Sequence, residues 1–346
     1  MIRTKKPQTI SPMKIRSILL LVFLLLTNYI FAQTITFVSA NTNKPLPKVS
    51  VFGKDGDLLG ISNIDGMIDR SLITKDQENF QLIYDNISLK TLSYEDFSDP
   101  IIKLNDRTKD IEAVTIKKGK GAKYMIIKGN FTSYVTLNKK LNSYADGIVT
   151  YVFDLKSHKL KSANVQQYRI YNLKDPKNEK KLTATWDYKS FLQIPDLKKI
   201  GNLEKYENKN TVIKELKGSD RDQVEISGEF LKEKEFALFG YRLYDITNVL
   251  NISFEKDSKK QLRDLQEYNQ VSAIKIRHKS EPAYNQIMYH QNFYPTEIDL
   301  ADEKNIGDVK FDKDKSNFTE KYWENTSFPD LQLIFSSFFK EDLVLK

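Results

Sequence analysis

The 346-residue chain is 40% hydrophobic and 29% charged, with a formal net charge of +8. It contains no cysteine, which excludes disulfides, cysteine-based catalysis and a lipid anchor on a cysteine. Five of its cations lie in the first 32 residues, where there is no acid, so a chain without that segment carries a charge of about +3. So small a charge does not make the basic surface that nucleic-acid binding requires.

Residues 1–32 have the pattern of a secretory signal peptide. Lys14 and Arg16 precede an unbroken apolar run from Ile18 to Leu26, and a small-residue cleavage motif ends at Ala32. The apolar run is about half as long as the roughly 20 residues that a membrane-spanning helix needs. We therefore expect a cleaved signal peptide and no transmembrane span after cleavage.

Cleavage at this position predicts a mature protein that starts at Gln33. The residues before Met13 are polar and basic and contribute nothing to export, so the sequence leaves open whether Met1 or Met13 is the true start. The expected location is the periplasm, the outer membrane or the outside of the cell.

Residues 33–116 alternate short apolar segments with turn signals, which is typical of a small antiparallel β-sandwich. Asp55-Gly56 lies between two alternating segments, and Asp65-Gly66 follows ten residues later. An Asp-Gly pair in this context predicts a type I′ hairpin turn, because both central residues of that turn have positive φ.

Four segments of this region match the order of motifs in a known family. They are Asn43–Val51, Gly60–Gly66, Leu89–Phe97 and Ile111–Ile116. Together they resemble the carboxypeptidase regulatory-like domain, which has a transthyretin-like fold, often precedes TonB-dependent transporters and occurs in uncharacterised secreted envelope proteins. Thr36 and Ser93 depart from the family, which usually has glycine at both positions. The resemblance implies a fold and a cell-envelope location, and no catalytic residue.

Residues 117–123 are basic and contain glycine, which is typical of a linker, and a larger domain follows at 124–346. Its long alternating stretches predict mainly antiparallel β-structure. We expect strands at 149–155, 165–173, 236–244, 249–254, 271–279 and 284–293, the first two forming a hairpin. Segment 131–148 also resembles a part of uncharacterised secreted proteins that follow the same front domain, a family without known activity.

The larger domain also carries helical patterns. Apolar residues spaced by three predict a helix over 197–206, and a capping-box pattern at Ser258–Gln261 predicts another over 262–265. The clearest pattern is an amphipathic C-terminal helix whose apolar stripe is Leu331, Ile334, Phe335, Phe338 and Phe339. We expect this helix to dock on the sheet of its domain; a lid or partner-docking element is the alternative.

His278 and Glu281 match the His-x-x-Glu spacing of zinc peptidases. A catalytic zinc needs three protein ligands, and the only histidine that follows is His290. Reflecting the two predicted strands about their turn pairs His278 with Asn285 and His290 with Ala273, which keeps the histidines several residue pairs apart. We therefore predict no metal site and no cofactor.

Other catalytic chemistry has little support in the sequence. Three histidines offer few general bases, and neither a nucleophile motif nor a glycine-rich phosphate loop is present. Carboxylates are abundant, but sequence spacing does not show which of them converge. The 18 tyrosines and 20 phenylalanines favour core packing, with a concave aromatic face for a sugar, peptide or lipid as the alternative. No catalytic, cofactor-binding or metal-ligating residue is assigned.

The sequence thus predicts a mainly β protein with an N-terminal transthyretin-like sandwich, a larger antiparallel β domain and a C-terminal amphipathic helix. The expected function is that of a non-enzymatic exported cell-envelope protein that binds an envelope protein, peptide, glycan or lipid. The alternative is a secreted hydrolase of peptide or glycan that uses carboxylates.

Overall fold

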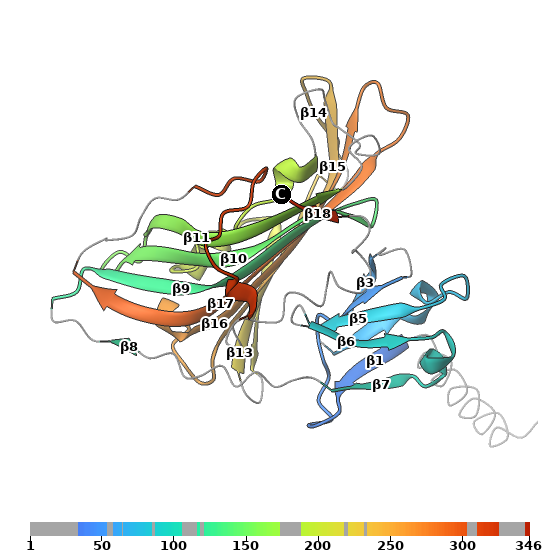
Figure 1. Cartoon of the computed structure of the whole chain (residues 1–346), viewed down its shortest axis with the longest axis horizontal. Coiled ribbons are helices and arrows are strands. Elements are labelled where there is room, and N and C mark those ends of the chain that lie inside the picture. The colour runs from blue at the N-terminus through green and yellow to red at the C-terminus, as the bar shows by residue number, and fades with distance from the viewer. Residues whose placement is uncertain are drawn as a thin grey trace, which may run out of the picture. The chain divides into compact units, whose positions relative to one another are not determined.

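The computed structural model of the protein consists of two compact units that meet in the sequence near residue 107. It describes residues 34–53, 58–63, 65–84, 87–105, 116–117, 121–173, 188–217, 221–231, 234–302, 310–324 and 343–346 (Figure 1). The mainly β fold expected from the sequence is confirmed. The predicted signal peptide, C-terminal helix and Asp55-Gly56 turn lie outside the described residues.

The first unit contains two small sheets. One has the order β4 (Met67–Asp69), β1 (Thr34–Ser39), β7 (Ile101–Leu104); the other has the order β3 (Leu58–Ile61), β2 (Ser50–Phe52), β5 (Phe80–Tyr84), β6 (Ile87–Leu92). Short 3-10 helices occupy Arg70–Leu72 and Glu95–Ser98. Buried side chains of both sheets form one core, in which Phe80 and Phe97 pack edge to face at 5.0 Å. The unit is therefore a β-sandwich.

Ser62 and Gly66 lie in a turn segment that packs against neighbouring backbone of the sandwich. The buried Ser62 hydroxyl donates to Leu46 O at 2.8 Å and accepts from Val49 N at 2.8 Å. Gly66 has φ +72°, and a β-carbon there would lie 2.5 Å from Phe37 O, so only glycine fits. Gly66 N donates to Asn63 O, and Asp65 N donates to the Asn63 side chain. Gly66 is therefore the fourth residue of the turn and not one of its two central residues, so the predicted type I′ turn at Asp65-Gly66 is wrong.

The second unit is built on one 11-stranded sheet. Its main order is β12 (Thr211–Lys217), β13 (Arg221–Phe230), β15 (Tyr241–Glu255), β16 (Leu265–His278), β17 (Asn285–Ala301), β9 (Tyr124–Leu137), β10 (Lys140–Asp154), β11 (Leu160–Leu173), β18 (Leu343–Leu345). Two short strands, β14 (Phe236–Leu238) and β8 (Ile116–Lys117), pair with β15 and β17. All pairs are antiparallel except β8 with β17.

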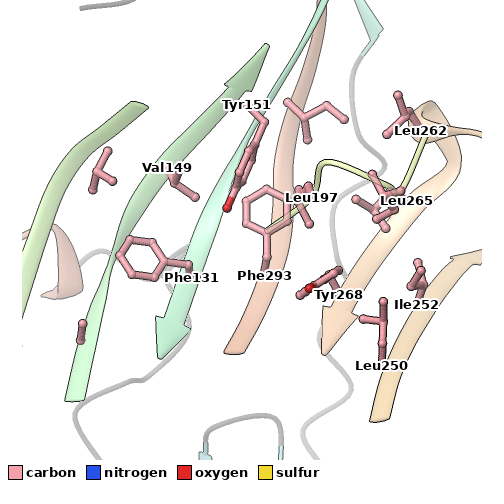
Figure 2. Packing of buried hydrophobic residues seen from close by; sticks show 14 of the residues in the cluster. Phe131, Val149, Tyr151, Leu197, Leu250, Ile252, Leu262, Leu265, Tyr268 and Phe293 are labelled. Carbon is pink, nitrogen blue, oxygen red and sulfur yellow. The ribbon is translucent and has the colours of Figure 1, made fainter. Parts of the chain in front are cut away.

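One face of this sheet, here called the apolar face, carries the main hydrophobic core (Figure 2). Tyr151 and Phe293 pack edge to face with their ring centroids 5.0 Å apart. The segment 188–206 covers them with fully buried Leu197 and with short 3-10 helices at Tyr188–Phe191 and Leu203–Tyr206. The Tyr151 hydroxyl donates to Pro195 O at 2.6 Å and fixes this cover.

The opposite face, here called the polar face, carries a row of polar residues at paired positions. The row is Lys214, Glu225, Asn251, Asn269, Asn292, Thr132, Asp146 and Arg169, one residue from each of eight strands. Paired residues of neighbouring strands project to the same side of a sheet, so these side chains lie next to one another. The alternation of apolar and polar residues in the sequence therefore separates the two faces.

Several predicted elements differ from the observed ones. The hairpin predicted from 149–155 and 165–173 is present as β10 and β11, but both strands are longer than expected. The strand predicted at 236–244 is a hairpin, because Phe239 and Gly240 form a tight turn with positive φ. Ile116, which the sequence places in the first domain, pairs with Ile298 in the large sheet.

The two predicted internal helices are also wrong. Residues 197–206 form turns and one 3-10 helix, because their apolar side chains lie flat on the sheet and not along one stripe of an α-helix. After Gln261 the chain makes a single 3-10 turn, Leu262–Asp264, and enters β16. Its capping box is formed by Gln261 and Asp264 and not by Ser258 and Gln261. In the described part of the chain, every helix is too short to span a membrane.

Candidate binding site

The two histidines considered as zinc ligands lie far apart in the large sheet. His278 ends β16 opposite Tyr241, whereas His290 is in β17 opposite Val271. The observed register pairs Asn285 with Ile276, so the predicted pairings of His278 with Asn285 and of His290 with Ala273 are wrong by two residues. The histidines are nevertheless separated along the strands. No group of three potential metal ligands occurs among the described residues.

His278 and Glu281 form hydrogen bonds within the turn that follows β16. Glu281 accepts a hydrogen bond from the backbone N of His278 at 3.0 Å, and His278 Nδ1 lies 2.6 Å from the Ser280 hydroxyl. The carboxylate therefore caps the backbone after β16 and does not orient the imidazole. The His-x-x-Glu spacing has a structural explanation here.

His290 lies on the polar face and is 3% exposed. Its ring stacks on Tyr134 with centroids 4.2 Å apart and an interplanar angle of 10°. Burial lowers the pKa of His290 to about 3, so the ring is neutral near pH 7. No described residue hydrogen-bonds its Nε2. Burial is the one cause of this pKa shift, so no carboxylate of the described residues acts on the imidazole as a catalytic partner would.

Asp146, Arg169, Tyr322 and Trp323 form a closed cluster at one end of the polar row, here called the latch. Arg169 donates to both carboxylate oxygens of Asp146, with Nε–Oδ1 at 3.0 Å and Nη2–Oδ2 at 2.5 Å. The Tyr322 hydroxyl also donates to Asp146 Oδ1 at 2.5 Å. The Trp323 ring lies 4.1 Å from the Arg169 guanidinium carbon.

The latch holds a surface segment on the sheet. Burial raises the pKa of Asp146, while the Arg169 and Tyr322 hydrogen bonds act in the opposite direction. All three donors point at the carboxyl oxygens, which is the arrangement of a carboxylate in a bidentate ion pair. Residues 310–324 wrap around β11: Phe311 packs on Tyr168 on the apolar face, and Tyr322 reaches Asp146 on the polar face. The latch is therefore structural.

The buried carboxylates of the described chain do not converge. They are Asp146, Asp222 and Glu267. Asp146 belongs to the latch, Glu267 lies on the polar face near Arg221, and Asp222 lies opposite Phe254 on the apolar face. Paired carboxylates for hydrolysis, as the alternative function requires, do not occur among these three residues.

An uncharged polar cluster interrupts the apolar face. Asn248, Gln270 and Ser272, here called the amide cluster, lie on β15 and β16. Asn248 Oδ1 accepts from Gln270 Nε2 at 2.7 Å and from the Ser272 hydroxyl at 2.6 Å. Tyr268 OH donates to Gln270 Oε1, and burial raises the pKa of Tyr268 well above its usual value, so this donor stays protonated.

An aromatic pair adjoins the amide cluster. Ser272 lies directly opposite Tyr289 of β17, and the Tyr289 ring is stacked against Phe191 of the cover segment with centroids 6.2 Å apart. Both rings are partly exposed, as are Asn248 and Gln270. Amide, hydroxyl and aromatic groups therefore share one partly open region of the apolar face.

The amide cluster keeps hydrogen-bonding capacity for a ligand. The two N–H groups of Asn248 Nδ2 bind no other described residue. Amides supply both donors and acceptors, and none of the groups in the cluster carries a charge or acts as a nucleophile with an adjacent base. The arrangement can bind a neutral polar molecule.

The sequence analysis did not identify the amide cluster. A signal was present, because Asn248 precedes Leu250 and Ile252, and Gln270 and Ser272 precede Ile274 and Ile276, at the same alternate positions. Polar residues thus occupy positions that face the core. Only the pairing of β15, β16 and β17 brings them together.

Comparison with known proteins gives little further information. No family model and no curated protein matches the chain. Three solved chains match, among them one described as "lipid-protein interactions in lipovitellin". That structure is 10% identical, with a TM-score of 0.29, over 53% of this chain and 26% of its own. The match thus spans about a quarter of the lipovitellin chain, and a TM-score of this size does not establish a common fold.

Proposed function

We propose that this is a non-enzymatic exported protein of the cell envelope whose larger unit binds a neutral, hydroxyl-rich ligand such as an oligosaccharide. The amide cluster beside Tyr289 and Phe191 carries this proposal. Sugar hydroxyls both donate and accept hydrogen bonds, as side-chain amides do, and the aromatic rings offer apolar surface for the sugar ring.

The front sandwich is an interaction or spacer module in this proposal. The motifs that resemble the carboxypeptidase regulatory-like family support this role, since residues such as Ser62 and Gly66 act in turns and packing. The signal-peptide pattern of residues 1–32 supports export. Mass spectrometry of the native N-terminus tests export, with Gln33 as the expected first residue.

Calorimetric titration with oligosaccharides from envelope glycans tests the ligand. Asn248→Ala and Gln270→Ala should each weaken binding by about fivefold, because each removes roughly one hydrogen bond of about 1 kcal/mol. Asn251→Ala is the matched control: it changes the same residue type on the same strand, but on the polar face. It should leave the affinity unchanged.

Three results would contradict the proposal. The first is absence of oligosaccharide binding, and the second is binding that Asn251→Ala weakens as much as Asn248→Ala does. The third is release of new reducing ends or amino groups during incubation, which would favour the hydrolase. Binding of an uncharged peptide in place of the sugar, with the same response to the variants, would retain the site and change its ligand class.

A further inference from the structure

A hairpin extends from the large sheet at the end where β15 begins and β16 ends (Figure 1). It consists of residues 234–245, which contain β14 and the start of β15, and residues 275–284, and is here called the hairpin arm. Leu238 pairs with Tyr241, which in turn pairs with His278. The arm is therefore a continuation of the sheet by strands β14, β15 and β16.

The tip of the arm is apolar and open to solvent. Phe239 is 90% exposed, and its neighbours Phe236 and Leu238 are each 48% exposed. They are among the few large hydrophobic side chains that the described chain exposes to this extent. Three such side chains within four residues form a patch, and an exposed apolar patch of this kind marks an interaction site.

The backbone of the tip is unfavourable for the residue that occupies it. Phe239 has φ 49° and is followed by Gly240 with φ 85°, which is the left-handed conformation of a type I′ turn. A bulky side chain is disfavoured there, whereas asparagine is well tolerated. The β9–β10 turn has the same geometry, with Asn138 and Lys139 at φ 50° and 73°. Folding therefore gives no reason for phenylalanine at position 239.

Cations and tyrosines lie behind the tip. The described arm carries five cations, Lys234, Arg242, Lys275, Arg277 and Lys279, and three acids, Glu235, Asp245 and Glu281. Arg277 lies over the Tyr284 ring at 4.9 Å, and Lys275 over the Tyr244 ring at 5.7 Å. Apolar side chains at the tip, with tyrosines and a cationic excess behind them, match the apolar interior, the interface and the phosphates of an anionic bilayer.

A lipid surface fits this patch better than a protein does. A stable protein interface buries about 800 Å² on each partner. The two phenylalanines supply at most roughly 250 Å² each, and Leu238 does not make up the difference. A bilayer accepts a narrow apolar tip, because the lipids adjust to its shape.

We propose that the hairpin arm docks this protein on an anionic lipid surface. Phe236, Leu238 and Phe239 enter the boundary between headgroups and acyl chains. Lys279 faces the lipid phosphates, and Arg242 stays paired with Glu235 beside it. This inference does not depend on the sugar ligand. The amide cluster adjoins the arm along β15 and β16 but is uncharged, whereas the arm presents exposed apolar and cationic side chains.

Co-sedimentation of the full chain with vesicles tests the inference. The vesicles contain phosphatidylcholine alone or phosphatidylcholine mixed with phosphatidylglycerol. We expect stronger binding to the anionic vesicles, which weakens as salt is added. Phe239→Asn should reduce binding by about tenfold or more, because one buried aromatic side chain is lost. Its melting temperature should stay unchanged or rise, since Asn-Gly is a preferred type I′ pair.

Three further variants separate the contributions. Lys279→Gln should weaken binding to anionic vesicles and leave the weaker binding to neutral ones unchanged. Lys139→Gln removes a cation from the other type I′ turn and should leave both unchanged. In Phe239→Trp, the new tryptophan should be quenched by brominated lipids, which places the tip below the headgroups.

The inference is overturned if neither vesicle binds the protein, or if Phe239→Asn and wild type bind alike. It is also overturned if the protein self-associates through the tip, so that Phe239→Asn abolishes a dimer in sedimentation velocity while no lipid binds. Binding lost equally in Lys139→Gln and Lys279→Gln would show charge attraction without a docking site and would likewise overturn it.

Discussion

The latch and the hairpin arm each contain an ion pair between an arginine and a carboxylate. The pair is buried in the latch and exposed in the arm. In the latch, the Asp146 and Arg169 side chains are 0% and 5% exposed, and Trp323 covers the guanidinium. In the arm, the Arg242–Glu235 pair is 51% and 39% exposed. A buried ion pair makes each partner depend on the other, whereas water replaces either partner of an exposed pair. The latch therefore contributes to stability, whereas the exposed Arg242–Glu235 pair of the arm contributes little to it.

Removal of the chain after Phe328 should have the largest effect on the stability of the second unit. It deletes β18, which pairs with β11 beside Arg169, and also the predicted amphipathic helix. The five apolar residues of that helix are each worth roughly 1.5 to 3 kcal/mol when buried. This is comparable with the roughly 5 to 15 kcal/mol net stability of a domain, so we expect the second unit to unfold.

Circular dichroism of the shortened protein measures this loss. A chain that lacks only residues 343–346 is the control for β18 alone and should keep a cooperative transition at a lower temperature. An unchanged melting temperature after truncation at Phe328 would show that the C-terminal segment is a lid or partner-docking element.

Substitution of Asp146 has the next largest expected effect. Asp146→Ala should destabilise the second unit by about 3 to 5 kcal/mol, because it leaves the Arg169 guanidinium buried without its carboxylate. The double variant Asp146→Leu/Arg169→Met should be less destabilised than the single variant. Urea unfolding followed by tryptophan fluorescence measures both. Arg242→Gln in the arm is the control and should leave the unfolding midpoint unchanged; similar losses at both sites would remove the distinction drawn between them.

At neutral pH, His290 gives the smallest of these effects, and the effect grows as the pH falls. The pKa of His290 is about 3 in the folded protein and about 6.5 when unfolded, so only the unfolded chain binds a proton between these values. The stability contribution is therefore full above pH 6.5 and decreases by about 1.4 kcal/mol for each pH unit as the pH falls, until pH 3 is reached. His290→Phe should remove this part of the pH dependence. If the wild type and the variant lose stability in parallel from pH 7 to 4, His290 is not the buried neutral group described.

The sequence determined the β class, the hairpin of β10 and β11 and the signal-peptide pattern, because each depends on alternation or composition over short distances. It did not determine the turn at Phe239 and Gly240, because phenylalanine does not resemble a turn residue and the positive φ is set by the flanking strands. It also predicted helices at 197–206 and 262–265, where packing on the sheet overrides local spacing.

The candidate site was decided by the tertiary structure alone. Asn248, Gln270 and Tyr289 lie on three strands, and a shift of one residue in any of these strands would turn its side chain to the polar face. Register depends on the packing of the whole sheet, which no single segment encodes. For the same reason Asp146 and Arg169, which are 23 residues apart, become partners only when β10 and β11 pair.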